Sequence, residues 1–153
     1  MQTTIGGTLM LKRNSDKLQN AMRSLEDALK YTRSGEFQGL GIEFKSILIS
    51  AVVQNFGLTF AVCRQMITRQ LMDQCGKAAV DGKSPEELLR MAAKEGMITN
   101  LDHWLEYLDC EHLTPSSHLA LRTFEKASAF LEDACELLHT CVERLQNERR
   151  RVA

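Results

Sequence analysis

The longest helical pattern in the sequence, from about Ile42 to Gln74, is apolar on two faces. One face carries Phe44, Leu48, Ala51, Leu58, Val62 and Met66, and the other carries Val53, Phe56, Phe60, Cys63 and Ile67. A helix that is apolar on two faces must be covered on both sides to keep its side chains out of water. The pattern therefore predicts a central helix in a bundle or a helix with one face covered by a second copy of the chain, and both arrangements can hold together.

Four further helical patterns surround this segment. They run from about Asp16 to Tyr31, from Pro85 to just before Gly96, over a short stretch that follows Asn100, and from about His118 to Gln146. Strand patterns are nearly absent, and the chain holds only two prolines and nine glycines, which is typical of a mostly helical protein. The prediction is an all-α fold, an up-down helical bundle of the four-helix-bundle type with a short helical pair before the last long helix.

We expect a single helical domain over residues 1–153. Residues 1–13 show no clear period and are predicted to form a loose N-terminal arm, and residues 147–153 are predicted to form a frayed basic tail. The strongest start signal lies at Ser84, Pro85 and Glu87, which have the spacing of a capping box with proline in the first turn. Gly96 is the expected left-handed residue after that helix.

Charge and cysteine content narrow the class of protein. The 19 Lys and Arg residues nearly balance the 20 Asp and Glu residues, so binding to a polyanion would need a local patch. Five cysteines without a Cys-x-x-Cys pair favour free thiols in a reducing cytosol. The apolar run from Ile47 to Val62 is interrupted by Gln54 and Asn55, it falls short of the roughly 20 apolar residues of a membrane span, and no signal peptide is present. We therefore expect a cytoplasmic protein without a membrane segment.

The polar cluster that calls for a chemical explanation is WLEYLDCEHLTPSSH, from Trp104 to His118. The sequence holds no phosphate loop, nucleophile elbow or His-Glu-x-x-His helix. Thiolate, imidazole and carboxylate groups in this stretch are potential metal ligands, namely Asp109, Cys110, Glu111, His112 and His118. Their spacing matches no standard metal site, so a solvated loop is the preferred interpretation, and neither a metal nor a cofactor is predicted.

Individual residues of this corner also have two interpretations. His112 and His118 suit a general base near neutral pH, but such a base needs a partner and a bound substrate. Ser116 or Ser117 is more simply explained as the N-cap of the last helix than as a nucleophile. Trp104 is expected to anchor its helix in the core or at an interface, with base stacking as the alternative.

Two more features have a structural and a functional interpretation. Asn55 lies between the apolar faces of its helix, where a buried amide needs hydrogen-bond partners and can fix the register of packed helices. The run from Arg149 to Arg151 can contact phosphates, although a short basic tail is more often a solvated end.

Three segments together resemble the HEPN-type nucleotidyltransferase substrate-binding family. VVQNFGLTFAVCRQMI is similar to the central helix of the family, SPEELLRMAAKEGMI to its Ser-Pro-capped helix and following turn, and WLEYLDCEHLTPSSH to its Trp-containing helix and Leu-Thr-Ser-His corner. The resemblance covers roughly Lys17 to Leu145 and rests on the order of the segments. It implies a helical bundle that dimerises through its long helices and binds a minimal nucleotidyltransferase encoded beside it.

In some HEPN proteins the same corner is the site of a metal-independent ribonuclease that acts as a toxin, with an Arg and a His separated by four to six intervening residues. The resemblance places His118 at the His position, but Glu111 falls where the Arg would be and His112 where an Asn is common. A carboxylate in place of a guanidinium reverses the charge offered to an RNA phosphate. The Tyr that often follows the His is also missing, because that position is Ala120.

The preferred hypothesis is a non-catalytic binding subunit that dimerises, docks a minimal nucleotidyltransferase and helps to bind its substrate, a nucleotide or RNA ligand, as half of a toxin–antitoxin pair. Cleft-lining residues would be Asp109, Glu111, His112, Thr114, Ser117 and His118. The dimer or partner interface would contain Val53, Asn55, Phe56, Phe60, Ile67 and Trp104. The alternatives are a divergent HEPN ribonuclease toxin that uses His118 and His112, and a plain dimeric scaffold without a nucleotidyltransferase partner.

Overall fold

A computed structural model describes residues 2–111 and 117–152 of the chain. Those residues form helices and no strand, which confirms the all-α prediction. The helices are α1 (Gln2–Arg33), α2 (Gly35–Gln38), α3 (Ile42–Cys75), α4 (Lys77–Val80), α5 (Pro85–Lys94), α6 (Leu101–Glu111) and α7 (Ser117–Val152).

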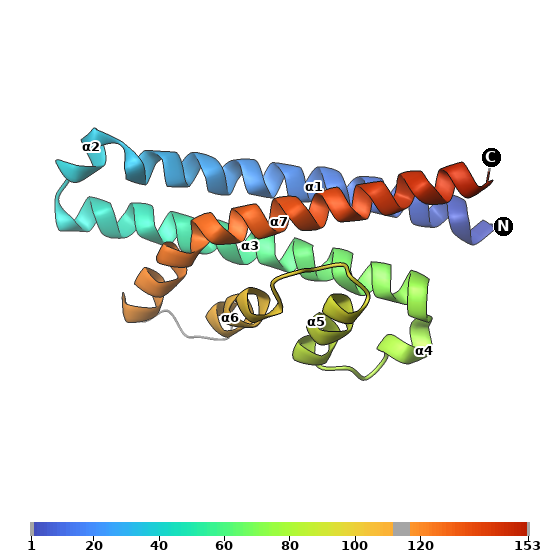
Figure 1. Ribbon diagram of the computed structural model, residues 1–153. Coiled ribbons are helices and arrows are strands. Elements are labelled where there is room, and N and C mark those ends of the chain that lie inside the picture. The colour runs from blue at the N-terminus through green and yellow to red at the C-terminus, as the bar shows by residue number, and fades with distance from the viewer. Residues whose placement is uncertain (1, 112–116, 153) are drawn as a thin grey trace.

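Three long helices form the body of the molecule. Helices α1 and α3 form an antiparallel hairpin closed by α2, and α7 lies along both of them, so that the N- and C-termini meet at the end opposite α2 (Figure 1). The short helices α5 and α6 pack together on one side of α3, and α6 also contacts α7. The observed architecture is thus the predicted bundle, with a short helical pair inserted before the last long helix.

An aromatic cluster fills the centre of the core, where α3, α6 and α7 meet. The five rings, all at most 2% exposed, are those of Phe56, Phe60, Trp104, Tyr107 and Phe130. The ring centroids of Phe56 and Phe130 lie 4.5 Å apart, and Tyr107 meets Phe130 edge-on at 5.0 Å. Offset and edge-to-face pairs of this kind each add about 1 kcal/mol to the effect of burial alone. The cluster therefore fixes α6 and α7 against one face of α3.

The predicted start of α5 is confirmed. The hydroxyl of Ser84 accepts a hydrogen bond from the backbone N–H of Glu87 at 3.1 Å, and the Glu87 carboxylate accepts one from the N–H of Ser84 at 2.9 Å. Pro85 occupies the first turn, where its missing N–H costs nothing. Gly96 follows the end of the helix with φ of 72°, a left-handed value that strains any residue with a side chain.

The two chain ends differ from the prediction. Helix α1 begins at Gln2, so residues 2–13 continue the helix that was expected to start near Asp16, in place of a loose arm. Helix α7 continues to Val152, so the basic tail is also helical. In both segments the periodicity of apolar residues is weak, but good helix formers such as Leu, Lys, Arg and Gln extend an existing helix at little cost.

Helix α3 is the one helix in the described part of the chain whose length and composition would allow it to cross a membrane. It contains an 18-residue stretch with a mean hydropathy of 1.7. This criterion is weak, because a core helix of a soluble protein also meets it. Here one face of α3 packs against α1, α5 and α7. Only 28% of this 18-residue stretch is buried, however, so one chain leaves much of the helix uncovered.

Candidate functional site

The predicted interface residues lie mainly in the core. Phe56, Phe60, Ile67 and Trp104 are at most 2% exposed, because α6 and α7 cover this face of α3. The prediction that these four residues form an interface was therefore wrong. The ring of Trp104 is also too buried to stack on a base. Val53 is half-buried. Asn55 is also half-buried, and its side-chain amide donates to the Ala51 carbonyl of its own helix at 2.8 Å, so it does not link two helices.

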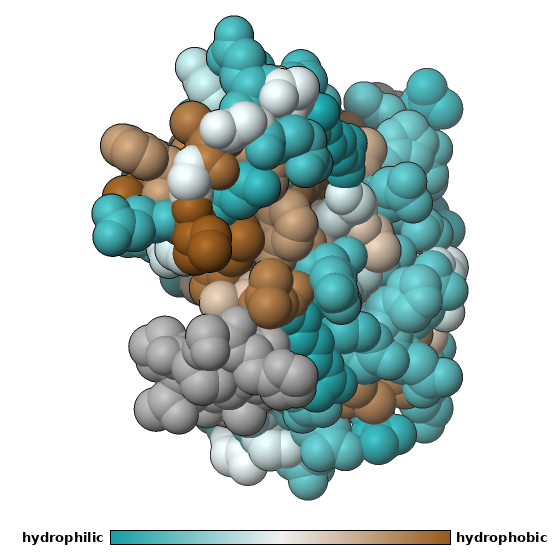
Figure 2. All heavy atoms as spheres, turned by 90° about the vertical axis from the view of Figure 1, so that its left-hand side faces the viewer, coloured by the Kyte–Doolittle hydropathy of each residue, from teal (hydrophilic) through white to brown (hydrophobic). Residues whose placement is uncertain are grey.

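The uncovered apolar surface lies on the other face of α3 and around its start. Ile47 is 63% exposed and Leu58 is 59% exposed on the same side of the helix. Other exposed apolar residues lie near Ile47 at the α2 end of the molecule. We use the name end patch for these five residues: Tyr31, Leu40, Ile42, Phe44 and Ile47. Figure 2, which looks onto that end of the molecule, shows hydrophobic side chains gathered there. A hollow of about 280 Å³ opens between Tyr31, Phe37, Phe44 and Leu48.

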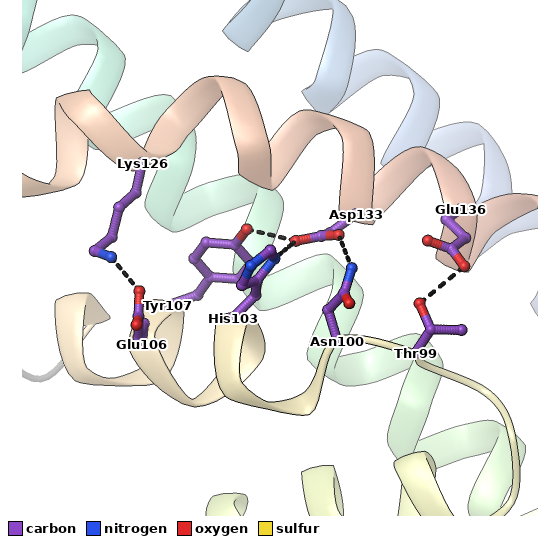
Figure 3. A network of polar contacts seen from close by, with 8 residues as sticks. All are labelled: Thr99, Asn100, His103, Glu106, Tyr107, Lys126, Asp133 and Glu136. Carbon is purple, nitrogen blue, oxygen red and sulfur yellow. Dashed lines mark hydrogen bonds and ion pairs between the residues drawn. The ribbon is translucent and has the colours of Figure 1, made fainter.

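A polar network fastens α6 to α7 (Figure 3). The carboxylate of Asp133 is 7% exposed and accepts hydrogen bonds from the Tyr107 hydroxyl at 2.5 Å and from the Asn100 amide at 3.3 Å. His103 Nδ1 lies 3.0 Å from the same carboxylate. A buried carboxylate is stable only when its oxygens are satisfied in this way. The network is thus explained by packing, and it was not predicted from sequence because Asp133 lies 26 to 33 positions away from its three partners in the chain.

Further polar contacts extend this junction along α7. Lys126 pairs with Glu106, and Thr99 donates to Glu136 at 3.0 Å (Figure 3). The hydrogen bond from Lys126 lowers the pKa of Glu106. Burial, followed by the hydrogen bond to Asp133, raises the pKa of Tyr107 well above its usual range. Tyr107 therefore remains a neutral donor and does not act as a base near pH 7.

The predicted corner is only partly described. Asp109 is exposed at the end of α6, and His112 and Thr114 lie outside the described residues. Ser117 and His118 are in the first turn of α7, with side chains that also lie outside what the structure describes. Both the cleft formed by these residues and a ribonuclease that uses His118 and His112 remain predictions.

Glu111, at the end of α6, forms an ion pair that the sequence did not indicate. Its Oε2 lies 2.6 Å from Nη1 of Arg64 on α3, and the two side chains are 27% and 33% exposed. The family resemblance would place an Arg at position 111. In the structure a guanidinium from a different helix reaches the carboxylate that stands there instead.

Arg64 also lines a pocket on α3. The pocket has a volume of about 440 Å³, and the described residues that line it are Ala61, Arg64, Gln65, Thr68, Arg69 and Met72. Nε of Arg69 is buried and has no hydrogen-bond partner within the described part of the chain. These residues were missed from sequence. The sequence pattern that could have indicated the pocket is a pair of arginines on one helix with Gln65 and Thr68 between them.

The described residues contain no group of three or more His, Cys, Asp and Glu side chains placed to bind a metal ion. His112 lies outside the described residues, so the preference for a solvated loop over a metal site remains a prediction. All five cysteines are described and free, with Cys63 and Cys141 buried and Cys75 and Cys135 exposed. Burial raises the pKa of Cys141 to about 11, so its thiol is unreactive at neutral pH.

A family model described as nucleotidyltransferase substrate binding protein like matches residues 13–143, more than four-fifths of the chain. The chain belongs to this family. The match covers α3, α5 and α6 completely and most of α1 and α7. It confirms the resemblance to a nucleotidyltransferase substrate-binding family that was seen in the sequence. A comparison with curated proteins gave no match.

Among solved structures, the fold is similar to that of HI0074 from Haemophilus influenzae, described as the fold of a substrate-binding domain of a nucleotidyltransferase. The TM-score is 0.75 with 22% sequence identity, and the alignment covers 83% of this chain and 98% of HI0074. At that identity the similarity establishes the fold, and it agrees with membership of the nucleotidyltransferase substrate binding protein-like family.

Proposed function

We propose that this protein is a non-catalytic, cytoplasmic binding subunit that forms a dimer and docks a small nucleotidyltransferase, helping to bind the substrate of that enzyme. The observation that carries the proposal is the family match over residues 13–143. The fold shared with HI0074 supports it, because HI0074 is described as a substrate-binding domain of a nucleotidyltransferase.

The uncovered face of α3 supports self-association. The end patch and Leu58 expose several large apolar side chains on one side of the molecule, and contiguous patches of this kind on soluble proteins mark interaction sites. The patch is rimmed by charged groups, since Lys45 lies 5.5 Å from the centre of the Phe37 ring and Glu36 borders the hollow. An apolar centre with a polar rim is the usual anatomy of a protein interface. We assign this surface to a second copy of the chain.

The first experiment is recovery of the tagged protein from its native cells, with bound proteins identified by mass spectrometry and the mass of the complex measured by light scattering. Recovery of a small nucleotidyltransferase in a complex of defined mass is the expected result. If only a dimer of this chain is recovered, docking of an enzyme is refuted, and a scaffold function takes its place.

The dimer is tested separately with the purified chain. Ile47→Asp places a charge in the end patch and should convert the dimer to a monomer in light scattering without loss of helical circular dichroism. Gln19→Asp, at an exposed position on α1, is the matched control and should remain dimeric. An unchanged mass for Ile47→Asp would move the self-association surface elsewhere.

The toxin–antitoxin role is the finer part of the proposal and has its own test. Expression of this chain alone should slow bacterial growth, and co-expression of the nucleotidyltransferase should restore it. Growth that is unaffected by either protein would leave the binding-subunit function in place without a toxin. If growth slows and RNA is cleaved, loss of cleavage in His118→Ala would support the divergent ribonuclease instead.

A further inference from the structure

The pocket on the second half of α3 is lined mostly by polar side chains. Two guanidinium groups, from Arg64 and Arg69, line it together with the amide of Gln65 and the hydroxyl of Thr68. All four side chains carry hydrogen-bond donors, and neither Asp nor Glu is among the described residues that line it. A pocket lined by several donors and two positive charges favours an oxyanion.

Arg69 provides an independent indication. Its Nε is buried and has no hydrogen-bond partner in the described part of the chain. A buried donor without a partner costs free energy, and in native proteins it usually indicates a group that is satisfied by a bound water, ion or ligand. Arg69 also lines the pocket, so the unpaired donor belongs to a side chain that an acceptor bound there would contact.

Arg64 is held in position by a hydrogen bond that its Nη1 donates to Oε2 of Glu111 at 2.6 Å. A guanidinium has five N–H donors, so this contact leaves most of them available to a ligand. Glu111 thus fixes the orientation of Arg64, but its negative charge lies close to any anion that Arg64 binds, and it opposes that binding.

We propose that this pocket binds the phosphate groups of a small phosphorylated ligand, with Arg64 and Arg69 as the main anchors, Gln65 and Thr68 as additional donors, and Glu111 as a competing anion. The volume of about 440 Å³ accommodates a di- or triphosphate group together with part of a nucleoside. The inference rests on the proposed function in naming a nucleotide as the source of the phosphate. The site itself is defined by its donors and lies beyond Leu58, away from the end patch.

The test is calorimetric titration of the purified full-length protein with ATP, with inorganic pyrophosphate and with a short single-stranded RNA. Binding of ATP and of pyrophosphate by the wild-type protein is expected. Binding of ATP alone would identify the nucleoside as part of the ligand. Binding of RNA without ATP or pyrophosphate would overturn the assignment to a small ligand.

Four variants locate the site. Arg64→Gln and Arg69→Met should each weaken ATP binding about tenfold or more, because each removes charged hydrogen bonds to phosphate. Glu111→Gln should strengthen binding severalfold, since it removes the competing charge. Arg90→Gln is the matched control, because Arg90 is an exposed guanidinium on α5 that pairs with Glu86 in the same way, and it should bind like the wild type.

Thermal unfolding separates a binding role from a structural one. Arg69→Met keeps the length of the side chain and removes an unpaired buried donor, so its unfolding temperature should equal or exceed that of the wild type while binding is lost. The proposal is overturned if the wild type binds neither ligand, if Arg90→Gln weakens binding as much as Arg64→Gln, or if Glu111→Gln weakens it. If the protein still recovers a nucleotidyltransferase from cells in that case, the proposed function stands and only the pocket is refuted.

Discussion

The two apolar faces of α3 are similar in sequence, but from the start of the helix as far as Leu58 they differ in exposure. Phe60, on one face, is fully buried against Trp104 and Phe130, whereas Phe44, near the start of the other, is 62% exposed. The face that we expected to bind a partner is the one that the chain covers itself. The comparison teaches that the presence of two apolar faces can be predicted from one sequence, but which of them is left open depends on where distant helices pack.

The largest expected difference between the faces is in stability. Phe60→Ala should lower the free energy of unfolding by about 3–5 kcal/mol, because it leaves a cavity inside the aromatic cluster. In the monomeric Ile47→Asp background, Phe44→Ala, the same substitution on the open face, should change it by about 0.5 kcal/mol or less. Urea unfolding followed by circular dichroism measures both. Equal losses would mean that the two faces are equally buried in solution.

The cover over the aromatic face depends on α6, which Asp133 fastens to α7. Tyr107→Phe removes one donor to this buried carboxylate and should lower the free energy of unfolding by about 1.5–3 kcal/mol. Tyr31→Phe removes a hydroxyl from a side chain that is 66% exposed, and should have almost no effect in the same urea titration. A stability loss shared by both variants would argue against the network.

Alkaline pH should weaken the covered side of the molecule. Burial raises the pKa of Cys141 from its ordinary value of 9.0 to about 11, so the folded state retains a proton that the unfolded chain releases. This stabilisation is complete below pH 9.0 and is lost as pH rises toward about 11, by about 1.4 kcal/mol per pH unit. Tyr107 and Cys63, whose pKa values are also raised by burial, act in the same direction.

Urea unfolding at a series of pH values above neutrality measures this slope. Cys141→Ala should show a shallower decline, whereas Cys75→Ala, at an exposed thiol, should follow the wild type. An identical decline in both variants would mean that the Cys141 thiol does not contribute.

The smallest effect is expected at Asn55, which is half-buried on α3. Its amide bonds to Ala51 of the same helix, and side-chain bonds of this kind do not strengthen a helix. Asn55→Ala should therefore change the free energy of unfolding by about 0.5 kcal/mol or less, and alanine is also the better helix former. A loss above about 2 kcal/mol would restore the register role that the sequence suggested.

Sequence reasoning succeeded where the controlling interactions are local. The capping box at Ser84, the left-handed Gly96 and the bounds of α3 each depend on neighbouring residues, and all three were confirmed. The helical ends of α1 and α7 were missed because their apolar pattern is weak and an existing helix extends at little cost. The polar contacts of Asp133 and Glu111 were missed for a different reason, since their partners lie 26 to 47 positions away in the chain.

The order of the helices along the chain has a consequence for synthesis. Helices α1 and α3 leave the ribosome before α6 and α7, which supply Trp104, Tyr107 and Phe130. Until residue 130 has been made, the rings of Phe56 and Phe60 lack their cover, and α3 presents both apolar sides to the cell. A chain that stops before α7 is then expected to be a hairpin with an uncovered aromatic face, which favours aggregation.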